Sequence, residues 1–309
     1  MPEILLRIGT RGSPLALAQA HETQRRLAAA LGAPAQAFEI VIIKTTGDSI
    51  VDRPLAEAGG KGLFTKEIDA AQLEGRIDVA VHSGKDLPTV LPDGLRLAGF
   101  LPREDVRDVL ISAKAATIAG LPQGARVGTA SLRRAAQVKR LRPDVSTELL
   151  RGNVQRRLDK AGSGEIDATL LALAGLRRLG LADRATAILE TDEFLPAVGQ
   201  GAIAIVARAD DAKTAAALEG VLDRPTGVAL AAERAFLRVL DGSCRTPIAG
   251  HARLEGDALF MRGMVLRTDG SESFEAQARG PQADAAELGM KVAHDILARL
   301  PAGVLAAHS

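Results

Sequence analysis

Short apolar runs alternate with stretches of helical periodicity in the first part of the chain. The strand-like runs lie at 4–9, 38–44 and 77–82. One helix is expected after Ser13, which suits an N-cap because Pro14 occupies the first helical position, and another at about 65–74. Strands that alternate with helices predict a mostly parallel sheet covered by helices.

The same alternation begins again near residue 107. Strand-like runs follow at 125–130, 166–172 and 202–207. Helices are expected after Ser131, the candidate N-cap, and around 154–161. We interpret the two series as two α/β domains, with the chain crossing back to the first one near residue 200.

From about residue 223 the pattern is that of a small α+β domain. A helix at 228–240 is followed by three strand-like segments between 248 and 279, and an amphipathic helix at about 283–299 comes last. We therefore expect three domains, formed by 1–102 with 196–220, by 103–195, and by 221–309.

Composition narrows the class of protein. The 309 residues are 47% hydrophobic and 25% charged, with a net charge of +1, as in globular chains. No run approaches the roughly 20 apolar residues of a membrane span, and the N-terminus lacks the order of a signal peptide. A single cysteine and scattered histidines favour a reducing compartment and predict no metal site. We therefore expect a cytoplasmic protein that does not bind membranes. Since no stretch indicates an interface, we expect a monomer.

Basic residues concentrate in the second domain. Residues 126–178 contain twelve Arg or Lys and five Asp or Glu, a local net charge of +7. Several lie next to strand ends and helix starts, where an open α/β sheet binds ligands. Arginines bind carboxylates through bidentate forks, so one interpretation is a site for an anionic small molecule and the other is a solvated basic face. The absence of Tyr and Trp and the near-neutral charge argue against nucleic acid.

The segment H-S-G-K-D-L-P, residues 82–88, directly follows a strand-like run. It brings polar side chains together where a cleft is expected, and Asp86 beside Lys85 is a candidate catalytic carboxylate. The alternative is structural. His82 is then a hydrogen-bonded residue at the strand end, and Asp86 is a turn-forming residue before Pro88.

Cys244, in D-G-S-C-R-T-P-I-A-G at 241–250, is the single cysteine of the chain. One interpretation is a buried filler, since free cysteine often behaves as a small hydrophobe. Its place after a helix end disfavours a thiolate, which argues against a cysteine protease or thiol-redox role. A permanently alkylated cysteine avoids this objection, because a thioether carries no charge.

Eight segments spanning residues 8 to 250 carry a more specific signal. They are I-G-T-R-G-S-P-L-A-L (8–17), G-G-K-G-L-F (59–64), V-H-S-G-K-D-L-P (81–88), V-G-T-A-S-L-R-R (127–134), L-R-G-N-V (150–154), A-G-L-R-R-L-G-L (174–181), L-P-A-V-G-Q-G (195–201) and G-S-C-R-T-P-I-A-G (242–250). In these segments and their order the chain resembles the porphobilinogen deaminase (hydroxymethylbilane synthase) family.

The resemblance implies a transferase of tetrapyrrole biosynthesis. Such an enzyme condenses four porphobilinogen molecules head to tail, with loss of ammonia, on a dipyrromethane cofactor that Cys244 holds through a thioether. Hydrolysis then releases hydroxymethylbilane to the next tetrapyrrole enzyme. Asp86 is implied as the catalytic carboxylate, which can stabilise an electron-poor azafulvene and exchange pyrrole N–H protons. The implied fold is two domains like type II periplasmic binding proteins with a small α+β C-terminal domain.

Each pyrrole of the growing chain carries an acetate and a propionate, so the resemblance assigns cationic and hydroxyl side chains to carboxylate binding. These are Arg11, Ser13, Ser83, Lys85, Thr129, Ser131, Arg133, Arg134, Arg151, Arg157 and Arg178. The loop at 47–62 resembles the family's active-site lid. The resemblance therefore places Lys61, Phe64 and Gln200 at the lid or the border of the cleft.

Three positions depart from the family's pattern. Gly84 replaces a larger apolar residue, which loosens the loop that aims Asp86. Ala130 stands where a second Ser is common, and Glu57 occupies a lid position that is Lys in some members. Two other classes are the alternatives to a transferase: a binding protein that captures a small anion, and a nucleic-acid-binding protein.

Overall fold

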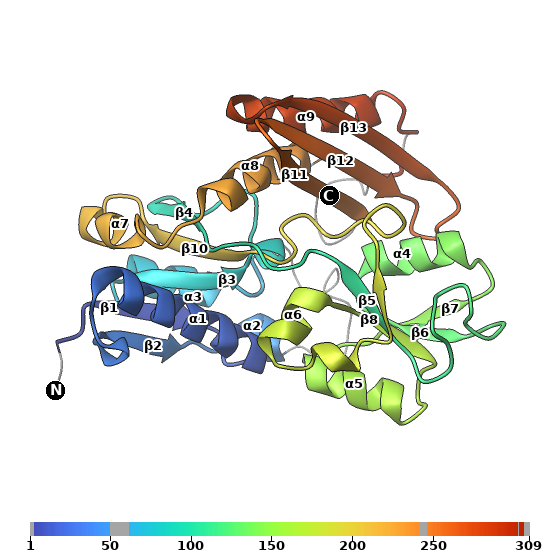
Figure 1. Cartoon of the computed structure of the whole chain (residues 1–309), viewed down its shortest axis with the longest axis horizontal. Coiled ribbons are helices and arrows are strands. Elements are labelled where there is room, and N and C mark those ends of the chain that lie inside the picture. Colours follow the sequence, from blue (N-terminus) through green and yellow to red (C-terminus); the bar gives the residue numbers. More distant parts are fainter. Residues whose placement is uncertain (1–2, 50–61, 241–245, 302, 306–309) are drawn as a thin grey trace. The chain divides into compact units, whose positions relative to one another are not determined.

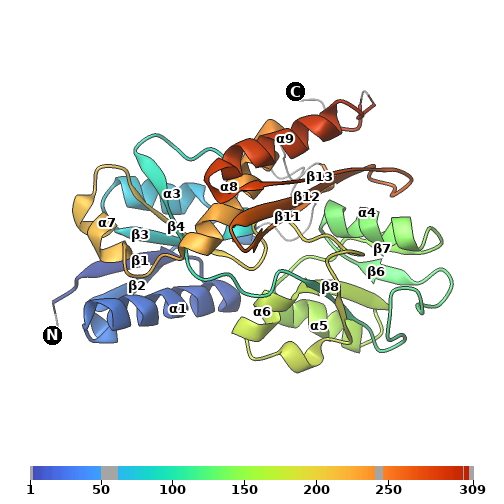
Figure 2. The same cartoon turned by 45° about the horizontal axis from the view of Figure 1, so that its top comes forward.

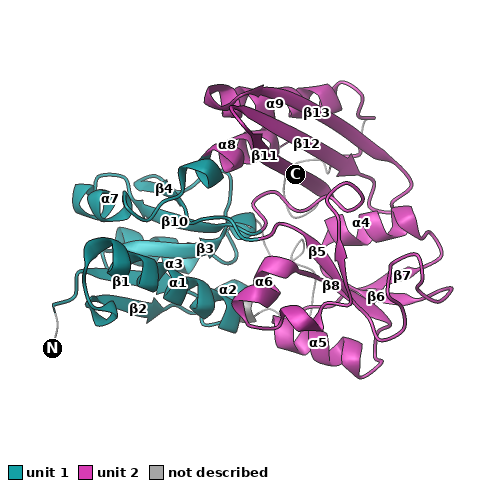
Figure 3. Cartoon of the chain, in the orientation of Figure 1, with its two compact units in different colours: residues 1–53, 57–104, 201–227 teal, residues 54–56, 105–200, 228–309 magenta. Residues whose placement is uncertain are grey.

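The computed structural model describes residues 3–49, 62–240, 246–301 and 303–305, and Figure 1 labels most of their helices and strands. The chain divides into two compact units (Figure 3). The first contains the described residues of 1–53, 57–104 and 201–227, and the second those of 105–200 and 228–309. The second unit therefore includes both the second α/β sheet and the C-terminal α+β part. The three-domain division expected from the sequence stays a prediction.

The first unit is a five-stranded sheet with helices on both faces. Its elements are β1 (Leu6–Thr10), α1 (Pro14–Leu31), β2 (Phe38–Ile42), α2 (Thr46–Ser49), α3 (Lys66–Leu73), β3 (Val79–Ser83), β4 (Leu95–Phe100), β10 (Ile203–Arg208) and α7 (Ala212–Leu218). The strand order is β2-β1-β3-β10-β4. Buried side chains such as Ile8, Leu27 and Ile205 form the core beneath α1 and α7, and α3 lies against β1, β3 and β10. Figure 2 shows α1 and α3 on opposite sides of this sheet.

The expectation of a mostly parallel sheet is half right. β1 runs parallel to β2 and β3, whereas β10 runs antiparallel to both β3 and β4. Apolar periodicity reveals that a strand is buried but not the direction in which it enters a sheet. Because β10 returns from a distant part of the sequence, no local βαβ unit fixes its direction.

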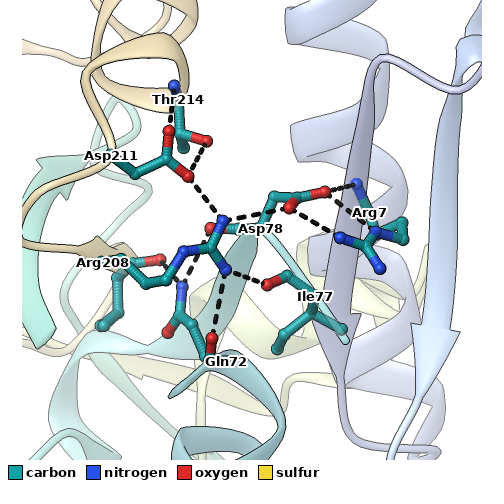
Figure 4. Close-up of polar contacts among 8 residues, drawn as sticks. Arg7, Gln72, Ile77, Asp78, Arg208, Asp211 and Thr214 are labelled. Carbon is teal, nitrogen blue, oxygen red and sulfur yellow. Dashed lines mark hydrogen bonds and ion pairs between the residues drawn. The ribbon is translucent and has the colours of Figure 1, made fainter. Parts of the chain in front are cut away.

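A network of charged residues ties the returning strand into the first unit (Figure 4). At the end of β10, Arg208 donates to Ile77 O at 2.6 Å, to Asp78 Oδ1 at 3.2 Å and to Asp211 Oδ2 at 2.6 Å. Arg7 of β1 donates to both carboxylate oxygens of Asp78, at 3.0 and 3.1 Å. Burial raises the pKa of Asp78, but hydrogen bonds from Arg7 and Arg208 outweigh it and lower that pKa. The ionised Asp78 therefore joins β1 to β10.

The second unit repeats the arrangement in its first half. Its elements are β5 (Asp108–Ile111), β6 (Arg126–Gly128), α4 (Leu132–Leu141), β7 (Ser146–Glu148), α5 (Val154–Gly162), β8 (Ala168–Ala172), α6 (Leu173–Arg178) and β9 (Ala187–Leu189). The strand order is β7-β6-β8-β5-β9, with β6 parallel to β7 and β8, and β5 antiparallel to β8 and β9. One core lies between the sheet and α4, and a second lies between the sheet and α5 with α6. This sheet too is mixed rather than mostly parallel.

The C-terminal part is antiparallel. After α8 (Arg224–Val239) come β11 (Ile248–Glu255), β12 (Ala258–Leu266), β13 (Ser273–Pro281) and α9 (Ala285–Leu297). The strands pair in the order β11-β12-β13, and α9 covers one face of this sheet (Figure 2). A Cβ added at Gly289 of α9 would come within 2.0 Å of the carbonyl oxygen of Ala232 in α8. The two helices therefore pack so closely that α9 needs glycine there.

These elements confirm the expected fold class, with two α/β sheets and a small α+β part. The strands that the sequence pattern missed are β4, β5, β7 and β9, which are short or lack alternation. None of the helices within the described ranges is long and apolar enough to cross a membrane.

Candidate active site

The site begins at the carboxyl end of β1. Ser13 is the N-cap of α1, as expected, and its Oγ accepts from the Ala16 amide at 3.3 Å. The half-buried Arg11 stacks on Phe64, with Cζ 4.1 Å from the ring centroid. The ring also lies against Gly47, where a Cβ would come within 2.5 Å of ring carbons. Phe64 thus fixes one face of the Arg11 guanidinium.

The parallel neighbour β3 ends at the same edge of the first sheet. Ser83, its last residue, is hydrogen-bonded to Gln19 of α1 at 2.9 Å. The chain then forms a one-turn 3-10 helix, Gly84–Asp86, which is anchored by the Gly84 amide donating to Ala202 O at 2.8 Å. Lys85 and Asp86 are both exposed on this turn. The structure therefore presents the Asp86 carboxylate to solvent from an anchored segment.

His82 lies inside the sheet, one residue before the end of β3. It is 5% exposed, and its Nε2 has no hydrogen-bond partner among the described residues. Burial, aided by the positive charge of Arg11, lowers the pKa of His82 to about 4. At neutral pH the imidazole is uncharged. His82 is thus a strand-end residue, as in the structural alternative, although none of the described residues forms a hydrogen bond with this nitrogen.

In the second unit the matching residues follow β6, which is parallel to β7 and β8. Thr129 is 8% exposed, and its Oγ1 accepts from the Ser131 amide at 3.1 Å. Ser131 is the N-cap of α4, as expected, and its Oγ accepts from the Arg134 amide at 3.4 Å. Both hydroxyls therefore help to shape the start of α4.

Arg133 and Arg134, in the first turn of α4, point into the protein rather than into solvent. Each is 5% exposed, and both donate to the fully buried carboxylate of Asp108 at the start of β5. The sequence analysis did not place Asp108 at the site. An acidic residue that opens an apolar run, as in R-D-V-L-I, was the available signal.

The remaining site residues are spread over the second unit. Arg151 is half-buried after β7, Arg157 donates from Nε to Gly152 O at 3.0 Å within α5, and Arg178 is half-buried at the end of α6. Gln200 is fully buried, with its amide donating to Val106 O at 2.8 Å. Lys61, Glu57 and Cys244 lie outside the described residues. The roles of all these residues stay predictions.

Comparison with known proteins identifies the family. The family model described as porphobilinogen deaminase, dipyromethane cofactor binding domain, matches residues 6–216. The model described as porphobilinogen deaminase, C-terminal domain, matches residues 228–298. The chain belongs to the porphobilinogen deaminase family.

Individual relatives agree with this assignment. The porphobilinogen deaminase of Nitrobacter winogradskyi is 60% identical over 297 residues, which are 96% of this chain and 94% of that protein. The one of Paracoccus denitrificans is 56% identical over 301 residues, 97% of this chain and 96% of that protein. Among solved structures, the periplasmic aliphatic sulphonate binding protein of Escherichia coli is similar with a TM-score of 0.41 at 17% identity, covering 77% of this chain and 70% of that one.

Membership in the porphobilinogen deaminase family fixes the reaction. The protein is an enzyme of the hydroxymethylbilane synthase type, whose small-molecule substrate is porphobilinogen and whose cofactor is dipyrromethane. The transferase interpretation of the sequence is thereby confirmed over the binding-protein and nucleic-acid alternatives.

Proposed function

We propose that Asp86 is the catalytic group of this porphobilinogen deaminase and that the cofactor is attached through Cys244. The catalytic role of Asp86 is supported by the position of its carboxylate. The carboxylate is exposed on a turn anchored to the end of β3, at the same sheet edge as Arg11. A carboxylate held in place is suited both to proton transfer and to stabilising positive charge.

The donors in each unit fit a group with several carboxylates. Hydroxyls, ammonium groups and guanidinium groups follow the carboxyl ends of parallel strands, which is the ligand-binding edge of open α/β sheets. The buried Nε of Arg133, which has no acceptor among the described residues, also suits an anionic ligand. We therefore assign carboxylate binding to Arg11, Ser13, Ser83, Lys85, Thr129, Ser131, Arg133, Arg134, Arg151, Arg157 and Arg178.

The division of roles follows from these side chains. Dipyrromethane, when bound, supplies the pyrrole carbon to which substrate is joined. Arg11 binds and orients substrate or cofactor carboxylates, with its guanidinium face held by Phe64. Asp86 stabilises the positive charge that develops on the substrate as ammonia leaves, and it then accepts a proton. His82 is uncharged at neutral pH, so we assign it no proton-carrying role.

The Asp86 assignment is tested with Asp86→Asn. This isosteric change removes the charge, and we expect kcat to fall by about 100-fold or more because proton transfer and charge stabilisation are both lost. Circular dichroism and thermal unfolding check that the variant is folded. The matched control is Asp93→Asn, an exposed acid in the turn before β4, which should keep wild-type kcat. If Asp86→Asn keeps most of the turnover, the catalytic group lies elsewhere.

The attachment site is tested by the intact mass of the purified protein. We expect a mass above that of the sequence by two linked pyrrole units, and the sequence mass alone in Cys244→Ser. An unmodified wild-type protein with full activity would rule out covalent attachment. Modified Cys244→Ser would assign the attachment to another residue.

Three further features belong to this proposal. We infer a monomer, a cytoplasmic location and transfer of the product to the next tetrapyrrole enzyme, as expected from the sequence. Light scattering of the eluted protein tests the first of these, since a mass of twice the chain would contradict it.

A further inference from the structure

A buried ion-pair cluster in the second unit is formed by Asp108, Arg133 and Arg134. Asp108 is fully buried, and both arginines are 5% exposed. Arg133 donates from Nη1 to Asp108 Oδ2 at 2.7 Å. Arg134 donates from Nε at 3.0 Å and from Nη2 at 2.6 Å, both to Asp108 Oδ1. One carboxylate thus accepts from two guanidinium groups on neighbouring residues of α4.

Arg134 is held on all three of its nitrogens. Besides its two bonds to Asp108, its Nη1 donates to Leu170 O of β8 at 2.9 Å. These bonds use three of the five N–H groups of the guanidinium, which leaves it little freedom to turn. Arg134 therefore fixes the cluster to the sheet.

Arg133 is held on one side of its guanidinium. Its Nη1 donates to Asp108 and to Leu195 O at 2.9 Å. Leu195 is fixed in turn by Gln137, which donates to its carbonyl at 3.0 Å and accepts from its amide at 2.8 Å. Two rigid acceptors thus hold Nη1 and set the plane of the guanidinium.

On the opposite side of Arg133, the part of the chain that the structure describes provides no such acceptor. Its Nε is buried and has no hydrogen-bond partner among the described residues. Buried N–H groups are nearly always hydrogen-bonded, so this one requires an explanation. In a guanidinium the N–H bonds of Nε and Nη2 are parallel and match the two oxygens of a carboxylate. The open edge of Arg133 therefore has the geometry of a carboxylate site.

Charge indicates the same kind of ligand. The cluster contains two cations and one anion, so one positive charge remains in a buried position. Burial lowers the pKa of Arg133, which reflects the cost of keeping this charge away from water. A ligand carboxylate would compensate both the charge and the unpaired Nε–H.

We propose that Asp108 is a positioning residue, which holds Arg133 so that its Nε edge binds a carboxylate of the cofactor or the growing chain. The inference rests on the proposed role of the site arginines in carboxylate binding. It adds that Arg133 contacts the carboxylate through its Nε edge, whereas Asp108 acts through Arg133.

Asp108→Asn distinguishes positioning from simple charge balance. If Asp108 only offset the arginines, its removal would raise the local positive charge and strengthen anion binding. Positioning predicts the opposite: the fraction of protein carrying the cofactor, measured by intact mass, falls by about tenfold or more, since charged hydrogen bonds are misaligned. In the molecules that do load, KM for porphobilinogen rises while kcat changes little.

The matched control is Asp167→Asn in the same unit. Asp167 is 8% exposed and accepts from Lys114 Nζ at 2.5 Å and from the Arg126 amide at 2.7 Å. Its loss should lower the melting temperature but leave cofactor loading at the wild-type level. Equal loss of loading in both variants would mean that Asp108 acts only through stability, which overturns the proposal.

Arg133→Lys keeps the charge and removes the Nε edge, so we expect it to load as poorly as Asp108→Asn. Normal loading in Asp108→Asn but not in Arg133→Lys would overturn the positioning role and leave the proposed carboxylate site intact. Normal loading in both would contradict the proposed role of Arg133 itself.

A measurement on the wild-type chain covers the case in which Asp108→Asn does not fold. Two-dimensional NMR of the arginine Nε–H groups, with Arg133 assigned from Arg133→Lys, compares protein made with and without porphobilinogen. We expect the Arg133 Nε–H resonance to shift strongly downfield on cofactor loading, while that of Arg134 stays nearly unchanged. An Arg133 resonance that is the same in both forms would overturn the inference.

Discussion

His82 is a titratable residue that the fold keeps uncharged. Burial and Arg11 lower its pKa from 6.5 to about 4. Between these values the unfolded chain binds a proton that the folded protein does not, so the free energy of unfolding falls as the pH is lowered. Over the whole interval the loss amounts to about 3 kcal/mol. Above pH 6.5 both states are neutral and His82 adds no pH dependence.

The prediction is that His82→Gln removes this part of the acid sensitivity. Urea unfolding at a series of pH values between neutral and about 4 should give a flatter curve for the variant than for the wild type, whatever its stability at neutral pH. His21→Gln, at an exposed position of α1, serves as the control and should keep the wild-type slope. Parallel curves for His82→Gln and wild type would show that His82 titrates normally in the folded protein.

At the scale of elements, Ser131 has two roles at the start of α4. Its hydroxyl caps the helix, and it belongs to the proposed carboxylate site. Ser131→Asp separates these roles, because aspartate is an equally good N-cap and its charge favours the positive end of the helix. We expect stability to stay within about 0.5 kcal/mol of wild type, while loading of the anionic cofactor falls severalfold.

Asn153→Asp provides the comparison for that experiment. Asn153 is the exposed N-cap of α5, where its side chain accepts from the Arg156 amide at 2.9 Å. The same charge added there should leave the fraction of loaded protein, read from intact mass, close to wild type. A similar loss in both variants would mean that charge anywhere in the unit disfavours loading, and Ser131 would have no special role.

The sequence predicted those elements whose determinants lie close together along the chain. Ser13 and Ser131 were expected as N-caps because capping depends on residues within one turn, and both cap in the structure. The antiparallel entry of β10 and of β5 was missed, because strand direction depends on partners distant in sequence. Asp108 was missed for the same reason: its partners on α4 lie some 25 positions away. The pattern of basic pairs does not indicate which arginines are buried.

At the scale of the whole molecule, the charge distribution predicts how the cofactor affects stability. The chain is nearly neutral, but residues 126–178 carry a net charge of +7. Within that stretch the buried cluster of Arg133, Arg134 and Asp108 retains one positive charge. The bound cofactor would supply negative charge to this region, and dissolved salt would reduce the same repulsion by screening.

The resulting prediction compares loaded wild type with Cys244→Ser, which we expect to lack the cofactor. Cys244→Ser should melt at a lower temperature than loaded wild type. The difference between the two melting temperatures should narrow as the ionic strength rises from about 0.05 M to about 0.5 M. Salt screens the repulsion between arginines that remains in the unloaded protein, whereas in the loaded protein the cofactor has already compensated that repulsion. Calorimetry at both salt concentrations measures this. Unloaded wild-type protein is the control for the substitution itself and should behave like Cys244→Ser. If both forms depend equally on salt, the cofactor does not neutralise the arginines, and carboxylate binding by this region would have to be abandoned.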